Sequence, residues 1–130
     1  MRHYQSLDTF KLEGNTVYLT SSGDDPVEAM AVMMREGERV AISISIGPLE
    51  LGLRPRYEEL QRAVASLKPV PGLSTTRHVG SEVAYMDLGL TEDRRLVMRP
   101  SLVSDASGHL SINLLVTPEA FEKLAAWLKG

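Results

Sequence analysis

Histidine, serine and aspartate are the side chains of this chain that could take part in proton transfer, nucleophilic attack or metal binding. The histidines His3, His78 and His109 lie far apart, and a zinc or catalytic site would need partners from other segments. Asp105 and Ser107 closely precede His109, but a nucleophile also needs an oriented base and an oxyanion site. Gly108, which lies between Ser107 and His109, makes this segment a typical turn. We therefore expect no enzyme, no catalytic residue, no metal site and no cofactor.

A set of arginines in the second half of the chain could form a basic patch for phosphates or acidic partners. The set consists of Arg77, Arg94, Arg95 and Arg99. The adjoining Glu92 and Asp93 favour local ion pairs on a solvated hairpin instead. Aromatic residues make up 5% of the chain and the net charge is -3, so the sequence lacks the usual features of a nucleic-acid binder.

The composition is that of one globular domain without cysteine chemistry. With 130 residues, 43% of them hydrophobic, the chain is long enough to build a core without crosslinks, and we expect a single domain over residues 1–130. The absence of cysteine excludes disulfides and a thiol nucleophile. The first residues are polar, and no run approaches the roughly 18 apolar residues of a membrane span. We therefore expect a cytoplasmic protein without a signal peptide or membrane insertion.

An alternating run at residues 40–46 predicts the most distinctive strand. Its two faces differ in kind, with Val40, Ile42, Ile44 and Ile46 on one and Ala41, Ser43 and Ser45 on the other. Such a strand buries its branched face in a core and leaves a smooth face of small residues free. Residues 47–52 lack the spacing of a phosphate-binding loop, and we interpret them as a connection from this strand to the next helix.

The other segments predict further strands and two helices. A hairpin is expected from residues 9–12 and 16–19, and strands from 83–90, 95–103 and 110–116, the last with Leu110, Ile112 and Leu114 on one face. Helices are expected at residues 56–67 and from Pro118 onward, where Thr117 is the expected N-cap. The fold class is therefore α+β, a mainly antiparallel β-sheet flanked by two or three helices that cover one or both of its faces.

Residues 26–36 are compatible with two structures. Asp25 followed by Pro26 is typical of a helix start, whereas the turn at Glu36-Gly37 favours a strand that pairs with residues 40–46. The segment carries Met30, Met33 and Met34. Methionines either fill a core or form an adaptable apolar binding surface, and both interpretations stay open here.

The order of these features resembles the DcrB-related family, which includes the Eag chaperones of type VI secretion effectors. Its motifs correspond to an early F-x-L hairpin (Phe10-Lys11-Leu12), an I-S-x-x-P-L segment (Ile44 to Leu49), a P-G element (Pro71-Gly72) and a V-G-x-x-A strand start (Val79-Gly80-Ser81-Glu82-Val83-Ala84). Two further strands and a closing helix complete the similarity, which spans nearly the whole chain. Two family positions differ, because the arginine after the Ile-Ser pair and the tryptophan of an early P-x-W segment are missing.

This resemblance implies a PsbP-like fold and a cytoplasmic homodimer that binds a secreted effector protein. The bound part would be an apolar helical segment near the N-terminus of the effector, held before export. The resemblance also favours a strand at residues 27–35. On that basis we expect Met30, Val32 and Met34, together with Ser43 and Ser45, to line the partner-binding face.

Two other classes of protein are alternatives. One is a single-stranded nucleic-acid-binding or transcription-associated β-sheet module that would contact phosphates through the four arginines named above. The other is an immunity or inhibitor protein, because small acidic α+β domains commonly bind toxins.

Overall fold

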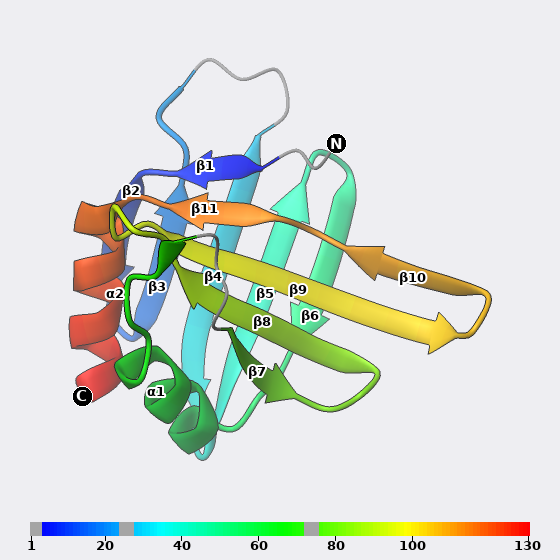
Figure 1. Ribbon diagram of the computed structural model, residues 1–130. Helices are drawn as coiled ribbons and strands as arrows, with labels where there is room; N and C mark the ends of the chain where they lie inside the picture. The colour runs from blue at the N-terminus through cyan, green and yellow to red at the C-terminus, as the bar shows by residue number, and fades with distance from the viewer. Residues whose placement is uncertain (1–3, 24–27, 72–75) are drawn as a thin grey trace.

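The described part of the chain folds into two β-sheets and two α-helices. In the computed structural model it comprises residues 4–23, 28–71 and 76–130. The strands of the two sheets cross one another, and both helices lie toward one end of the pair (Figure 1). This confirms the predicted α+β class with mainly antiparallel strands. The division into two sheets was not predicted, because period-two alternation marks the buried face of a strand but not the sheet it joins.

Sheet I is an antiparallel meander of five strands that follow one another in the chain. They are β2 (Thr9–Glu13), β3 (Thr16–Thr20), β4 (Ala29–Glu36), β5 (Arg39–Ile46) and β6 (Leu49–Leu53). Every neighbouring pair is antiparallel. The predicted hairpin of residues 9–12 and 16–19 is confirmed as β2 and β3.

Sheet II combines strands from both ends of the chain. They are β1 (Gln5–Leu7), β7 (Arg77–Gly80), β8 (Ala84–Leu90), β9 (Leu96–Asp105), β10 (Gly108–Ser111) and β11 (Leu114–Val116). The order is β1-β11-β9-β8-β7, and β10 also pairs with β9. The strands predicted at 83–90 and 95–103 are confirmed as β8 and β9. The pairing of β1 with β11 is parallel.

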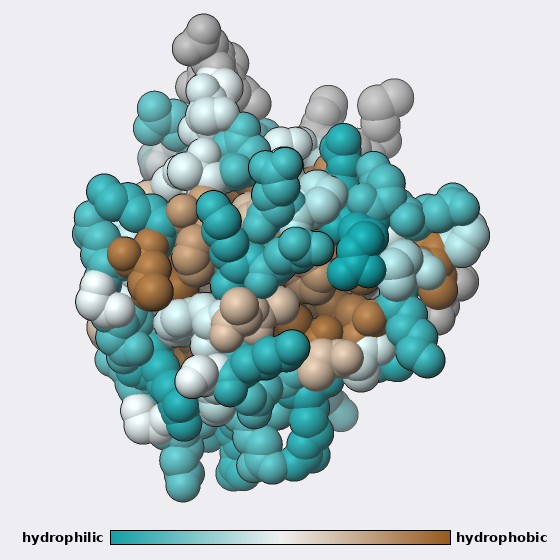
Figure 2. Space-filling model, turned by 90° about the vertical axis from the view of Figure 1, so that its left-hand side faces the viewer, coloured by the Kyte–Doolittle hydropathy of each residue, from teal (hydrophilic) through white to brown (hydrophobic). Residues whose placement is uncertain are grey.

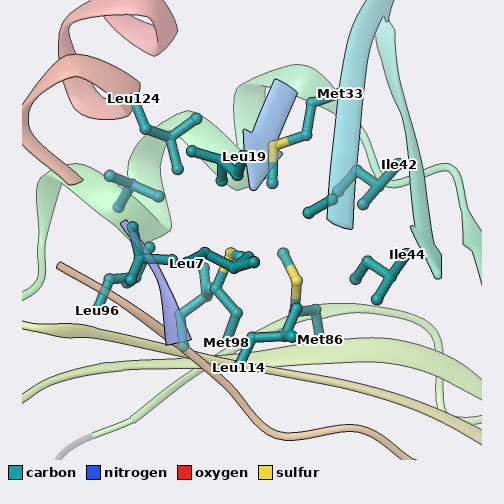
Figure 3. Packing of buried hydrophobic residues seen from close by; sticks show 14 of the residues in the cluster. Leu7, Leu19, Met33, Ile42, Ile44, Met86, Leu96, Met98, Leu114 and Leu124 are labelled. Atoms are coloured by element: carbon teal, nitrogen blue, oxygen red, sulfur yellow. The ribbon is translucent and has the colours of Figure 1, made fainter. Parts of the chain in front are cut away.

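One hydrophobic core fills the space between the sheets. Figure 3 shows side chains of both sheets pointing toward each other, with Leu19, Met33 and Ile42 of sheet I facing Met86, Met98 and Leu114 of sheet II. Leu124 of the C-terminal helix joins the same cluster. The inner face of each sheet is therefore committed to the core, and the outer faces remain for other roles.

The two helices close one end of the sandwich and are linked to each other. They are α1 (Tyr57–Ala65) and α2 (Pro118–Lys129), which confirm the helices predicted at 56–67 and from Pro118. The hydroxyl of Tyr57 donates to the carbonyl oxygen of Leu128, and Gln61 Nε2 donates to the same oxygen at 2.9 Å. Thr117 is the N-cap residue of α2, as predicted, although its side chain makes no capping hydrogen bond.

The segment with two compatible structures is a strand, β4. Its buried residues recur every second position, at Ala29, Ala31 and Met33. Pairing with β5 over the whole length of β4 provides backbone hydrogen bonds that a helix would have to forgo. The strand expectation is confirmed for the described residues, and Pro26 and Val27 lie outside them.

The interpretation of residues 47–52 as a strand-to-helix connection was wrong. Gly47 takes a positive φ of 56° at the first position of a two-residue turn, as tight hairpin turns require. The chain then pairs back along β5 as β6, with Leu51 and Leu53 buried. The alternating leucines of β6 did not predict a strand because Gly47 and Pro48 precede them and Gly52 interrupts them.

The single strand predicted at 110–116 is divided into two. The chain leaves the ladder at Ile112 and Asn113 between β10 and β11. Ile112 and Leu114 are buried, whereas Leu110 is exposed at the end of the sandwich. The three residues nevertheless share a face, as predicted, because Leu110 lies opposite Leu102 and Leu114 lies opposite Met98, two residues on the same side of β9.

Candidate binding face

The outer face of sheet I is the candidate functional surface, and it is here called the open face. Its members are the outward residues of four strands, namely Thr16, Tyr18 and Thr20 on β3, Met30, Val32 and Met34 on β4, Ala41, Ser43 and Ser45 on β5, and Glu50 and Gly52 on β6. Most of the residues that alternate with them, such as Val17, Ala31, Ile42 and Leu51, point inward and belong to the core. The open face is half-buried or exposed throughout.

The register of β4 and β5 brings the predicted contact residues side by side. Met30 lies opposite Ser45, and Val32 lies opposite Ser43. Met34 lies opposite Ala41 at the next outward position. The structure thus places all five predicted residues on the open face, while their role in binding a partner stays a prediction.

The three methionines considered together in the sequence separate into two groups. Met33 is 1% exposed and belongs to the core, whereas Met30 and Met34 are 36% and 37% exposed on the open face. Two large apolar side chains in solvent on one strand are the kind of feature that marks an interaction surface.

A hollow of about 640 Å³ lies on the open face. Tyr18, Val32 and Met34 line it on one side, and Ser43 and Gly52 line it on the other. Apolar side chains with a few hydroxyl groups are typical of surfaces that bind an apolar ligand or segment and fix its orientation. The flexible thioether of methionine adapts to partners of different shape.

Gly52 leaves free space at the edge of this hollow. It lies opposite Ser43, and a methyl group in its place would meet only the carbonyl oxygen of Ile42, at 4.0 Å. Beside it, the Ser43 hydroxyl donates to Glu50 Oε1 at 2.8 Å. The strip formed by Ala41, Ser43 and Gly52 therefore has little side-chain volume, and another backbone can approach it closely.

Three arginines border the open face at one corner, and the sequence analysis missed them. This arginine corner consists of Arg39, Arg54 and Arg56, which line a cleft of about 330 Å³. The backbones of Arg39 and Arg56 form an antiparallel bridge in the same register that places Ser43 opposite Gly52. The pairing of β5 with the chain after β6 therefore continues past the end of β6. The available signals were the Arg54-Pro55-Arg56 spacing and the position of Arg39 two residues before Ala41.

The arginine corner is only partly neutralised by its neighbours. Arg54 Nη2 forms an ion pair with Glu36 Oε1 at 3.1 Å, and Arg39 Nη1 donates to the carbonyl oxygen of Arg54 at 2.7 Å. Neither Arg39 nor Arg56 forms an ion pair with any residue that the structure describes. Two guanidinium groups are therefore available to an acidic partner.

His78 and the turn at residues 105–107 have local structural partners. His78 Nδ1 lies 3.0 Å from Asp87 Oδ1, and its ring lies 4.5 Å from that of Tyr85. Hydrogen bonds from the hydroxyl and backbone N–H of Ser107 hold the pKa of Asp105 below its usual value, as expected for a turn. Within residues 4–23, 28–71 and 76–130, no group of three or more histidines and carboxylates could hold a metal ion. His3 lies outside these ranges.

Two of the four arginines of the nucleic-acid alternative have side-chain partners of their own. Arg77 Nε donates to the Ser66 hydroxyl at 3.0 Å, and Arg95 Nε lies 3.0 Å from Asp93 Oδ2. Arg99 is half-buried within β9. The ion pair predicted on the hairpin after β8 is thus present, and the arginines that do gather are those of the arginine corner.

The surface on the side of the helices and the comparisons indicate no further site. Figure 2, seen from the side of the helices, shows mostly hydrophilic residues with separate apolar patches. No helix in the described part of the chain is both long and apolar enough to cross a bilayer. Comparison with protein-family models, curated proteins and solved structures finds no match to this chain. The function proposed below therefore rests on the geometry and chemistry of the open face.

Proposed function

We propose that this protein is a non-catalytic chaperone or adaptor that holds an apolar helical segment of a partner protein on its open face. The observation that carries the proposal is the pairing of exposed Met30 and Met34 with a strip of small residues on β5 and β6. An enzyme would need converging catalytic groups, whereas this surface combines apolar area with adaptable shape.

The residue types on the open face suit a helix better than an extended strand. Small residues let helices approach closely in membranes, and hydroxyl groups hydrogen-bond across such contacts. The strip of Ala41, Ser43 and Gly52 offers the same chemistry to a helix laid over the sheet. Val32 and the two exposed methionines would then contact the apolar side chains of that helix.

The partner that we propose is a secreted effector of a type VI secretion system, as the resemblance to Eag chaperones implies. An apolar segment destined for export exposes surface that would aggregate or insert into the wrong membrane unless it is covered. We extend the proposal to a cytoplasmic homodimer on the same ground. Leu49 and Leu110, which are exposed and line one hollow outside the open face, are the residues that we assign to the contact between copies.

Binding to a defined apolar helix tests the proposal. The probe is a soluble carrier protein that bears a helical segment of about 20 leucine, alanine and glycine residues, the length of a membrane span. We expect Val32→Lys, which buries a charge under the helix, and Gly52→Leu, which fills the hollow, each to weaken binding about tenfold or more. The dissociation constant is measured by fluorescence anisotropy.

Val103→Lys is the matched control, because Val103 is also half-buried on a strand but belongs to β9 of sheet II. Its affinity for the probe should equal that of the wild type. Melting curves followed by circular dichroism establish that all three variants are folded. Wild-type protein that fails to bind the probe, or equal losses in Val103→Lys and Val32→Lys, would contradict the proposal.

A further inference from the structure

The open face has opposite charges at its two ends along β6. Glu50 lies at one end, Gly52 lies in the middle, and Arg54 and Arg56 continue the line at the other. Six residues of extended chain separate Glu50 from Arg56, which corresponds to about 20 Å. A helix of about 13 residues has the same length, so one bound helix spans both ends.

The electrostatic difference between the ends is large enough to orient a bound helix. Arg39 joins Arg54 and Arg56 at one end, and Glu36 neutralises one of these three charges. Glu59 also lines this cleft, but its Oε1 accepts the backbone N–H of Gly80 at 2.9 Å. At the opposite end, the carboxylate of Glu50 accepts a hydrogen bond from the Ser43 hydroxyl. It forms no ion pair with any of the described residues.

Building on the proposed function, we propose that the open face fixes the direction of the bound helix and selects helices that are followed by acidic residues. The C-terminal end of a helix carries a partial negative charge and its N-terminal end a partial positive charge. The helix therefore lies with its C-terminal end at the arginine corner and its N-terminal end at Glu50. Aspartate or glutamate residues just after the apolar segment reach Arg39 and Arg56, with which they form charge-assisted hydrogen bonds.

The test compares apolar segments that differ only in where the charges lie. Three carrier proteins bear one leucine-alanine-glycine segment of about 13 residues, the length of the open face. The first has two aspartates after the segment, the second has two aspartates before it and the third has two lysines after it. We expect the first to bind about fivefold more tightly than the second, and the third to bind most weakly. Raising the salt concentration to about 1 M should reduce these differences, because exposed charges are then screened.

Substitution of the arginine corner shows whether the selectivity arises there. The variant Arg39→Gln/Arg56→Gln should bind the first two carriers equally while it retains its affinity for the segment itself. The control Arg62→Gln/Arg95→Gln removes the same charge from exposed sites on α1 and before β9 and should keep the fivefold preference. Melting curves again establish that both variants are folded.

The outcomes separate this inference from the proposed function. If all three carriers bind wild-type protein equally, the directional inference is wrong and the proposed function stands. The same conclusion follows if the preference survives in Arg39→Gln/Arg56→Gln. If no carrier binds, the proposed function fails and the inference fails with it.

Discussion

At the scale of single residues, two glycines in sheet strands have opposite roles. Gly80 has a positive φ of 113°, and a methyl group there would lie 2.6 Å from the carbonyl oxygen of Ala84. Gly52 has ordinary extended geometry and open space around it. The first glycine is thus required by the fold at the turn between β7 and β8, whereas the second is free to vary as far as the fold is concerned. Its small size therefore matters for what covers the open face.

The contrast predicts opposite effects of the same substitution. Gly80→Ala should destabilise the protein by about 1–3 kcal/mol, because of strained backbone and contact with Ala84. Gly52→Ala should leave the free energy of unfolding unchanged or raise it by up to about 1 kcal/mol, since alanine restricts the unfolded chain more than glycine does. Urea denaturation of both variants measures the difference. A loss of stability in Gly52→Ala equal to that in Gly80→Ala would show that Gly52 is structurally required.

At the scale of elements, strong hydrophobic alternation and helix start signals were sufficient to predict strands and helices. Short segments without such a pattern were not predicted. The run at 40–46 and the Pro118 helix start predicted β5 and α2 from their own residues. The strand β1 has three residues and no pattern of its own, and it forms only because β11 lies beside it. Long-range pairing of this kind cannot be inferred from local sequence.

The stability of the fold should depend on β1 despite its small size. Leu7 is fully buried between the sheets. We expect Leu7→Ala to lower the free energy of unfolding by about 2–5 kcal/mol, the usual cost of a cavity left by a core leucine. Ser6→Ala, at an exposed position of the same strand, is the matched control and should change it by less than about 0.5 kcal/mol. A small effect of Leu7→Ala in urea denaturation would mean that β1 is dispensable.

At the scale of the whole molecule, the arrangement of the sandwich determines which surface is free. The core occupies the inner faces of both sheets, and the helices close one end. Five members of the open face were predicted. Period-two alternation placed Ser43 and Ser45 on one side of their strand, and the strand that the family resemblance favoured at residues 27–35 placed Met30, Val32 and Met34. The sequence did not predict Tyr18, Gly52 or the arginine corner, since these join the surface only through the register of β3 and β6 with their neighbours.

Methyl signals of the methionines test most directly whether an apolar helix covers the open face. The chain has six methionines, of which Met30 and Met34 lie on that face while Met33, Met86 and Met98 are buried in the core. With ¹³C-methyl labelling, the carrier bearing the apolar segment should shift the signals of Met30 and Met34 and leave those of the three core residues nearly unchanged. Single Met→Leu substitutions assign each signal to its residue. The absence of shifts at Met30 and Met34, or shifts only in the core, would contradict binding at the open face.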